Sequence, residues 1–142
     1  MEKDVFEIFQ DFEKLKKRAD KIAFLQEQGK LVPAIKDICR GIYDPRLKFV
    51  LPEGKPPYNP NRPESVPSNL KRLYRQFGDF VEGARSQGQP QYKIETKFIQ
   101  MLESIHAEDA LIVIDMVNKK TSVKGLTKKI VQEAYPNMIP SE

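Results

Sequence analysis

Residues 52–67 read Pro-Glu-Gly-Lys-Pro-Pro-Tyr-Asn-Pro-Asn-Arg-Pro-Glu-Ser-Val-Pro, and they hold six of the eleven prolines in the chain. Proline fixes the backbone angle φ and removes an amide donor, so this segment cannot join a helix or a sheet. It favours extended or polyproline II backbone instead. Because the sequence on both sides has helical spacing, we expect a mainly α protein. This extended segment, called the strap below, should connect two helical halves.

The composition indicates one folded domain. The chain has 142 residues, enough to bury its own core, with 39% hydrophobic and 31% charged residues. No run approaches the ~18 consecutive apolar residues of a membrane span, and the charged N-terminus is unlike a signal peptide. We therefore expect residues 1–142 to form a compact single domain of five or six helices that stays in the cytoplasm and does not contact a membrane.

Apolar residues at helical spacing predict the helices of the N-terminal half. One stripe runs over residues 4–28, where Gly29 is expected to end the helix, and a second runs over residues 31–42. Two aromatic residues of this segment, Phe6 and Phe24, lie off the first stripe. That helix is therefore covered on more than one side, broken near Arg18 or met by a partner. Residues 47–51 alternate in polarity and predict a short extended segment.

The C-terminal half shows three further helical patterns and one ambiguous segment. The closest match to helical spacing covers residues 70–84, and another helix is expected over residues 91–105. Residues 110–117 are apolar almost all round. The preceding acids and the length favour helix there, whereas the isoleucines and valine favour strand. Thr127 should cap a last helix that ends before Pro136.

The residue types on which enzymes rely are scarce. The chain has one histidine and one cysteine. His106 precedes two acids, but a single imidazole at a helix start is more often a cap or hinge than a metal ligand. Cys39 lies among apolar residues at helical spacing, which is typical of a buried structural thiol. Since the glycines form no phosphate-binding loop, we expect no enzymatic activity, no metal and no cofactor.

The strap contains one candidate protein-binding edge. Pro57, Pro60 and Pro63 recur at every third residue, which is the period of polyproline II, and Tyr58 and Arg62 lie beside them. As a structural element, the strap would cross the protein's own helices and bury Tyr58. As a functional one, it would be a pre-ordered ligand for an aromatic groove on another protein. The structural interpretation is favoured, because a proline-dense segment stays ordered only where something covers it.

A second candidate surface is a stretch of five lysines within eleven residues: Lys119, Lys120, Lys124, Lys128 and Lys129. With the preceding helix they would form a helix-turn-helix-like hairpin whose ammonium groups and helix amides meet the phosphates of DNA or RNA. A solvated surface turn is the commoner explanation for such a run. No arginine or aromatic residue interleaves the lysines, so binding would be weakly sequence-specific and sensitive to salt.

Three stretches of the sequence resemble a known family. They begin Leu51-Pro-Glu-Gly-Lys-Pro-Pro-Tyr, Phe98-Ile-Gln-Met-Leu-Glu and Lys124-Gly-Leu-Thr-Lys-Lys, and run to residues 70, 110 and 136. They are similar to small uncharacterised proteins of contractile-tailed bacteriophages, cyanophages and related myoviruses included. The resemblance covers most of the chain from about residue 31. It implies a viral origin and assigns no residue roles.

This resemblance, together with the scarcity of catalytic groups, leads to two functional hypotheses. The first is a non-enzymatic phage accessory protein that acts in the cytoplasm of the infected bacterium. It would bind a host or phage protein of transcription, replication or the particle, for example in host takeover. The alternative is a nucleic-acid-binding accessory protein that uses the C-terminal lysines. The net charge of +4 permits this alternative without requiring it.

Overall fold

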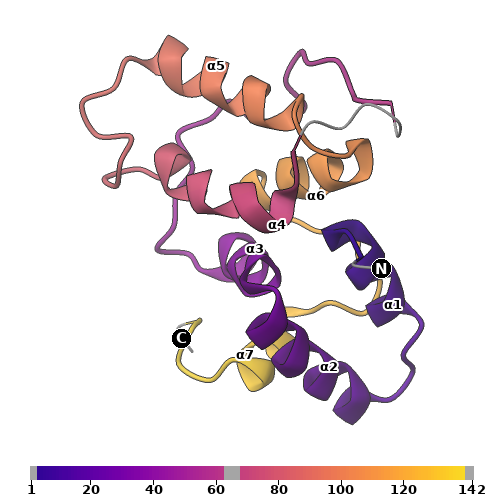
Figure 1. The fold of residues 1–142 in the computed structure, drawn as a ribbon. Coiled ribbons are helices and arrows are strands. Elements are labelled where there is room, and N and C mark those ends of the chain that lie inside the picture. The colour runs from indigo at the N-terminus through magenta and orange to yellow at the C-terminus, as the bar shows by residue number, and fades with distance from the viewer. Residues whose placement is uncertain (1–2, 63–67, 140–142) are drawn as a thin grey trace.

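The structure is a computed structural model that describes residues 3–62 and 68–139, and its regular elements are helices (Figure 1). In chain order they are α1 (Val5–Glu13), α2 (Arg18–Leu31), α3 (Pro33–Tyr43), α4 (Leu70–Leu73), the 3₁₀ helix η2 (Tyr74–Phe80), α5 (Gln91–Leu102), α6 (Ala107–Val117) and α7 (Lys128–Ala134). The expected mainly α fold is confirmed. It has seven α-helices within these residues, rather than five or six.

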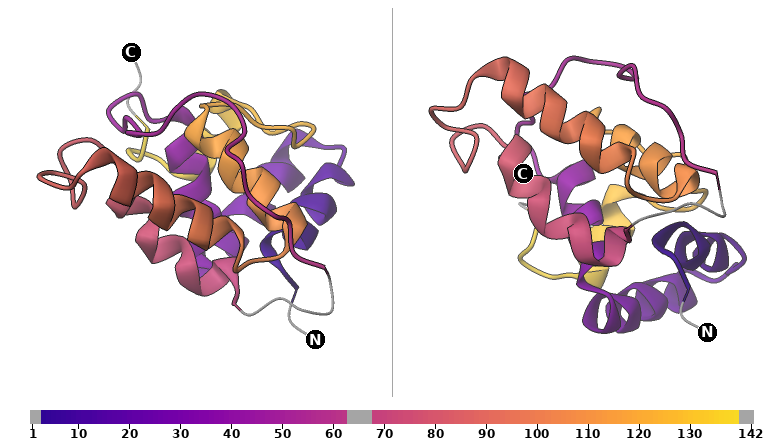
Figure 2. Two further views of the ribbon diagram at one scale, coloured as in Figure 1. Left: turned by 90° about the horizontal axis from the view of Figure 1, so that it is seen from above. Right: turned by 45° about the horizontal axis from the view of Figure 1, so that its top comes forward.

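Helix α3 lies at the centre of the fold, where it contacts α2, α4, α6 and η2 (Figures 1 and 2). Pro33 occupies its first turn, a position where the missing amide has no intrahelical partner to lose. Its inward face carries Ile35, Ile38, Cys39 and Ile42, all buried as the spacing predicts. Burial raises the pKa of Cys39 to about 12, so the thiol stays protonated and unreactive.

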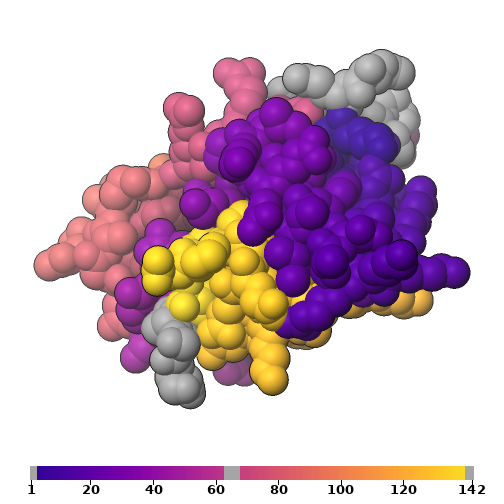
Figure 3. Space-filling model, turned by 90° about the horizontal axis from the view of Figure 1, so that it is seen from below, coloured from indigo at the N-terminus to yellow at the C-terminus, as the bar shows by residue number. Residues whose placement is uncertain are grey.

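Helix α7 returns to the N-terminal part of the molecule. It packs against α2, while α6 packs against α3, α1 and α5. Figure 3 shows the C-terminal segment lying against the N-terminal helices on one face of the molecule. The two sequence halves on either side of the strap therefore share one core.

The N-terminal helix expected over residues 4–28 is two helices, because a short link separates α1 from α2. Of the three interpretations of that pattern, a break near Arg18 is correct. The expectation that Gly29 ends the helix is wrong, since α2 continues past it. Gly29 instead makes room for Tyr135. A Cβ atom there would lie 2.7 Å from the Tyr135 hydroxyl oxygen, which donates to the Leu25 carbonyl at 2.5 Å.

The pattern over residues 70–84 is also only partly helical. After one α-helical turn, the chain continues as the 3₁₀ helix η2. Three residues complete a turn of a 3₁₀ helix, so side chains spaced by three lie on one face. The aromatic residues of η2 have this spacing: Tyr74, Phe77 and Phe80. Val81 and Ala84 lie beyond the helix, because Val81 forms an isolated antiparallel bridge with Phe49.

The remaining elements agree with the sequence patterns. Residues 110–117 lie in α6, which decides between helix and strand. The Thr127 hydroxyl accepts a hydrogen bond from the Ile130 amide at 3.3 Å and caps α7 as predicted. The extended segment near residue 49 is confirmed by the Val50 amide, which donates to the Phe80 carbonyl at 2.8 Å. In the part of the chain that the structure covers, no helix combines the length and apolar character needed to cross a membrane.

Candidate binding surfaces

The described part of the strap, residues 52–62, lies along α5 and α6 (Figure 2). It is anchored at two points. Near its start, Gly54 and Asn118 exchange two hydrogen bonds, from the Gly54 amide at 2.9 Å and from the Asn118 amide group at 3.2 Å. Farther along, the Asn61 side chain donates to the Glu103 carbonyl at 2.6 Å. These contacts fix the strap on the C-terminal helices.

The side chains of the strap point in two directions. Tyr58 is half-buried and packs against the core, and burial raises its pKa. Pro57, Pro60 and Arg62 are exposed, and Pro63 lies outside the described residues. The strap therefore covers the protein's own helices through Tyr58 while it presents two prolines outward. The structural and the functional interpretations of this segment are compatible.

Among the five lysines of the basic stretch, Lys119 differs from the others. Its ammonium group donates to the carbonyls of Gly41 at 2.7 Å and Asp44 at 3.0 Å, and it lies 5.2 Å from the centroid of the Phe49 ring. Burial lowers the pKa of Lys119. Because free carbonyls gather at a helix C-terminus, this ammonium serves as an internal cap for α3.

The other four lysines divide between two elements. Lys120 and Lys124 belong to the segment between α6 and α7 and are exposed, while Lys128 and Lys129 begin α7. The Lys124 amide donates to a Glu13 carboxylate oxygen at 2.9 Å, which directs this segment towards α1. Since α6 packs on α3 and α7 packs on α2, the helix-turn-helix-like hairpin expected from the sequence does not form.

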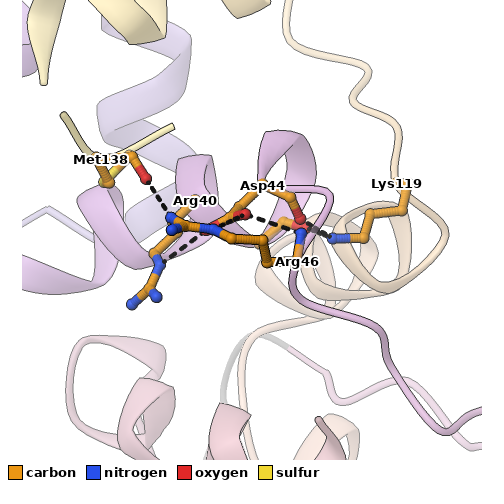
Figure 4. Close-up of polar contacts among 6 residues, drawn as sticks. Arg40, Asp44, Arg46, Lys119 and Met138 are labelled. Carbon is orange, nitrogen blue, oxygen red and sulfur yellow. Dashed lines mark hydrogen bonds and ion pairs between the residues drawn. The ribbon is translucent and has the colours of Figure 1, made fainter. Parts of the chain in front are cut away.

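A buried carboxylate, that of Asp44, organises the C-terminal end of α3 (Figure 4). Arg46 donates to both of its oxygens at 3.0 Å, and Arg40 approaches it at 3.4 Å. The hydrogen bonds from Arg46 lower the pKa of Asp44 to about 2. Arg46 also donates to the Met138 carbonyl at 3.2 Å. The cluster therefore fastens the C-terminal segment to α3.

A groove with a volume of about 470 Å³ opens between α3 and η2. Its lining includes three arginines, three aromatic residues and one carboxylate: Arg40, Arg75, Arg85, Phe49, Tyr74, Phe77 and Asp37. We call it the arginine groove. Sequence reasoning missed it because the three arginines come from three separate segments. The one signal in the sequence was the basic start of the segment from Lys71 to Arg75.

The contact between α1 and α6 contains a second buried carboxylate. Asp109 accepts the Phe6 amide at 2.8 Å, and burial raises its pKa to about 7. His106 caps α6, because its Nδ1 accepts the Glu108 amide at 3.0 Å. The His106 ring also stacks on Phe6 with ring centroids 4.4 Å apart. The expected capping role of His106 is confirmed.

Comparison with protein families gave one match, over residues 8–123, to a family of unknown function, DUF6433. Comparison with curated proteins and with solved structures gave none.

Proposed function

The chain belongs to the DUF6433 family, and we propose that it is a non-enzymatic accessory protein of a contractile-tailed bacteriophage that acts by binding another protein. The partner is a host or phage protein of transcription, replication or the particle, met in the cytoplasm of the infected bacterium. The viral origin rests on the resemblance of residues 51–70, 98–110 and 124–136 to phage proteins. The proposed binding surface is the outward edge of the strap.

The observation that carries this proposal is the double anchoring of the strap. Gly54 is tied to Asn118, and Asn61 is tied to Glu103, so the segment between them, which bends at Pro57, is held in place before any partner arrives. A disordered ligand loses backbone freedom on binding, at a cost of roughly 1–2 kcal/mol per ordered residue. A segment already fixed on its own protein avoids most of that cost.

The orientation of the strap determines what it can offer a partner. Because Tyr58 packs inward, the rings of Pro57 and Pro60 face solvent. Proline rings spaced by three fit grooves lined by aromatic side chains. Arg62, also exposed, follows at one end of this edge. A groove with aromatic walls matches that surface.

Replacing both exposed prolines tests the proposal. Pro57→Ala together with Pro60→Ala removes the two rings but leaves both anchors in place. We expect at least a tenfold loss of affinity for the partner, with the free energy of unfolding changed by less than about 1 kcal/mol. The partner is identified by affinity purification from infected-cell extract with mass spectrometry. It is then purified and titrated by calorimetry.

Pro52→Ala is the matched control. Pro52 is an exposed proline of the same strap, but it precedes the first anchor. Its replacement should leave affinity for the purified partner unchanged. Equal affinity of the wild type and the Pro57/Pro60 variant would remove the strap from the proposal.

The second candidate function is nucleic-acid binding through the basic stretch. The observation in its favour is that Lys120, Lys128 and Lys129 make no hydrogen bond or ion pair through their ammonium groups with any residue in the described ranges. Lys119 is already bound to the carbonyls at the end of α3, so it contributes less to this surface than its sequence position suggests.

A further inference from the structure

We propose that the arginine groove, together with a neighbouring hollow that Arg72 lines, binds single-stranded nucleic acid, with phosphates on Arg72 and Arg75 and an unpaired base against Tyr74. This site uses neither the described part of the strap nor the basic stretch. The proposal therefore does not depend on the proposed protein partner.

The charges of the groove favour a phosphate-bearing ligand. Three guanidinium groups and one carboxylate, that of Asp37, line it, and burial raises the pKa of Asp37, which favours its uncharged form. A neighbouring hollow of about 370 Å³ is lined by Ser68, Lys71, Arg72, Leu73 and Arg75. Among the residues that the structure describes, no acid lines this second hollow. Arg75 borders both hollows.

The four arginines of the two hollows divide into two that are already paired, Arg40 and Arg85, and two that are available. Arg40 approaches the Asp44 carboxylate at 3.4 Å. The guanidinium of Arg85 donates to Asp79 at 2.6 Å and to the Arg75 carbonyl at 2.5 Å. It lies against Gly78, where a Cβ atom would be only 2.8 Å from Arg85 Nη2. Arg72 and Arg75 are exposed, and their guanidinium groups have no hydrogen bond or ion pair with residues in the described ranges. They can therefore bind phosphates without breaking an interaction with those residues.

Tyr74 supplies a stacking surface beside these charges. It is half-buried, lines the groove and directly precedes Arg75. In 3₁₀ geometry it lies on the same face as Phe77, which is buried and also lines the groove. Stacking of a base on an aromatic side chain contributes about 1–3 kcal/mol, and arginine combined with aromatic residues is typical of single-strand binding. A base paired within a duplex cannot enter such a groove. The same aromatic surface favours nucleic acid over an acidic peptide.

The test measures fluorescence anisotropy of a labelled oligothymidylate of about 12 nucleotides, within the usual site size of such proteins. We expect the wild type to bind this single strand more tightly than a duplex of equal length. Arg72→Glu with Arg75→Glu should weaken binding at least tenfold. It should also lower the dependence on salt by about 0.7 in logarithmic slope for each phosphate that the variant no longer neutralises. Tyr74→Leu should weaken binding about fivefold, without a change of charge.

Lys16→Glu with Lys17→Glu, two exposed lysines of the link between α1 and α2, is the matched control. Each double variant replaces two cations by two anions and lowers the net charge from +4 to zero, so a general field effect would be equal in both. We expect the affinity of the lysine variant for the oligothymidylate to fall by less than threefold. Circular dichroism verifies the fold, and Arg72→Gln with Arg75→Gln repeats the test without charge reversal.

Three outcomes would overturn the proposal. The first is an equal loss of affinity in the arginine and lysine variants. The second is equal binding of single strand and duplex with no effect of Tyr74→Leu. The third is displacement of the oligonucleotide by polyglutamate of the same charge at the same concentration, which would assign the groove to acidic peptides.

Discussion

Two buried carboxylates of this protein, Asp44 and Asp109, have opposite environments and opposite pKa shifts. Arg46 donates to both oxygens of Asp44, and these hydrogen bonds outweigh burial and lower its pKa to about 2. Asp109 has a single backbone donor, the Phe6 amide, which does not offset burial, and its pKa rises to about 7. Asp44 therefore stays charged throughout the physiological range, whereas Asp109 exchanges its proton within it.

The titration of Asp109 predicts a stability that decreases as the pH rises. An unfolded carboxyl loses its proton near 3.8, the folded one near 7. Between these values unfolding releases a proton, so a higher pH favours the unfolded chain. The stabilisation is complete below about pH 4 and is lost as the pH rises through about 7, with an upper limit of about 4 kcal/mol. Asp109→Asn should remove this decrease, measured by urea unfolding at a series of pH values.

An asparagine at this position retains an oxygen that can accept the Phe6 amide, so the packing of α1 on α6 is preserved. Asp20→Asn is the control. Asp20 is an exposed carboxyl in the first turn of α2, and its replacement should leave the pH dependence of the wild type intact. If the Asp109→Asn variant unfolds with the wild-type pH dependence, another group is responsible for it.

At the scale of elements, the sequence predicts a helix well where its own apolar spacing and caps suffice. Helix α3 begins at Pro33 and α7 is capped by Thr127, as expected from the sequence. Where a contact with a residue distant in the sequence fixes the bounds or the type of a helix, the local apolar spacing does not predict them. Arg18 at the start of α2 pairs with Glu133 of α7. Phe80 of η2 packs edge-on against Phe98 of α5, with ring centroids 5.2 Å apart.

Gly29 illustrates a local rule overridden by a distant side chain. Alanine in a helix interior is about 1 kcal/mol more favourable than glycine. Here, however, a Cβ atom would lie within 2.7–2.8 Å of the Tyr135 hydroxyl and ring. We expect Gly29→Ala to lower the free energy of unfolding by about 1–3 kcal/mol, because the ring is held in place by its hydrogen bond to Leu25. Urea unfolding measures the change.

The sign of this effect should depend on Tyr135. In a Tyr135→Leu background the clash is gone, and Gly29→Ala should become stabilising by about 0.5–1 kcal/mol. Gln26→Ala, at an exposed position of the same helix, should have the same small effect in both backgrounds. If Gly29→Ala changes the free energy of unfolding equally in both backgrounds, the close approach of the Tyr135 ring is not the reason for glycine at this position.

At the scale of the whole molecule, the surfaces differ in how far sequence could locate them. The strap was predictable, because its prolines act locally. The arginine groove was not, since Arg40, Arg75 and Arg85 meet only through the packing of η2 on α3. The internal role of Lys119 was equally hidden, because its carbonyl partners, Gly41 and Asp44, lie on a distant helix.

The two proposed surfaces occupy different parts of the fold. The described part of the strap, residues 52–62, lies along α5 and α6, and the groove lies between α3 and η2. None of these strap residues lines the groove. Sites that share no partner usually have independent energetics, with coupling below about 0.5 kcal/mol. A protein with two such surfaces can hold a protein partner and a single strand together.

Independence of the surfaces is testable by exchanging variants and ligands. The Pro57/Pro60 variant should bind the labelled oligothymidylate with wild-type affinity, and the Arg72/Arg75 variant should bind the purified protein partner with wild-type affinity. Saturating either ligand should change the affinity for the other by less than about twofold, because coupling between sites is reciprocal. Displacement of the oligonucleotide by the partner would instead place both ligands on one surface. Simultaneous binding would make the protein a bridge between its partner and exposed single strands.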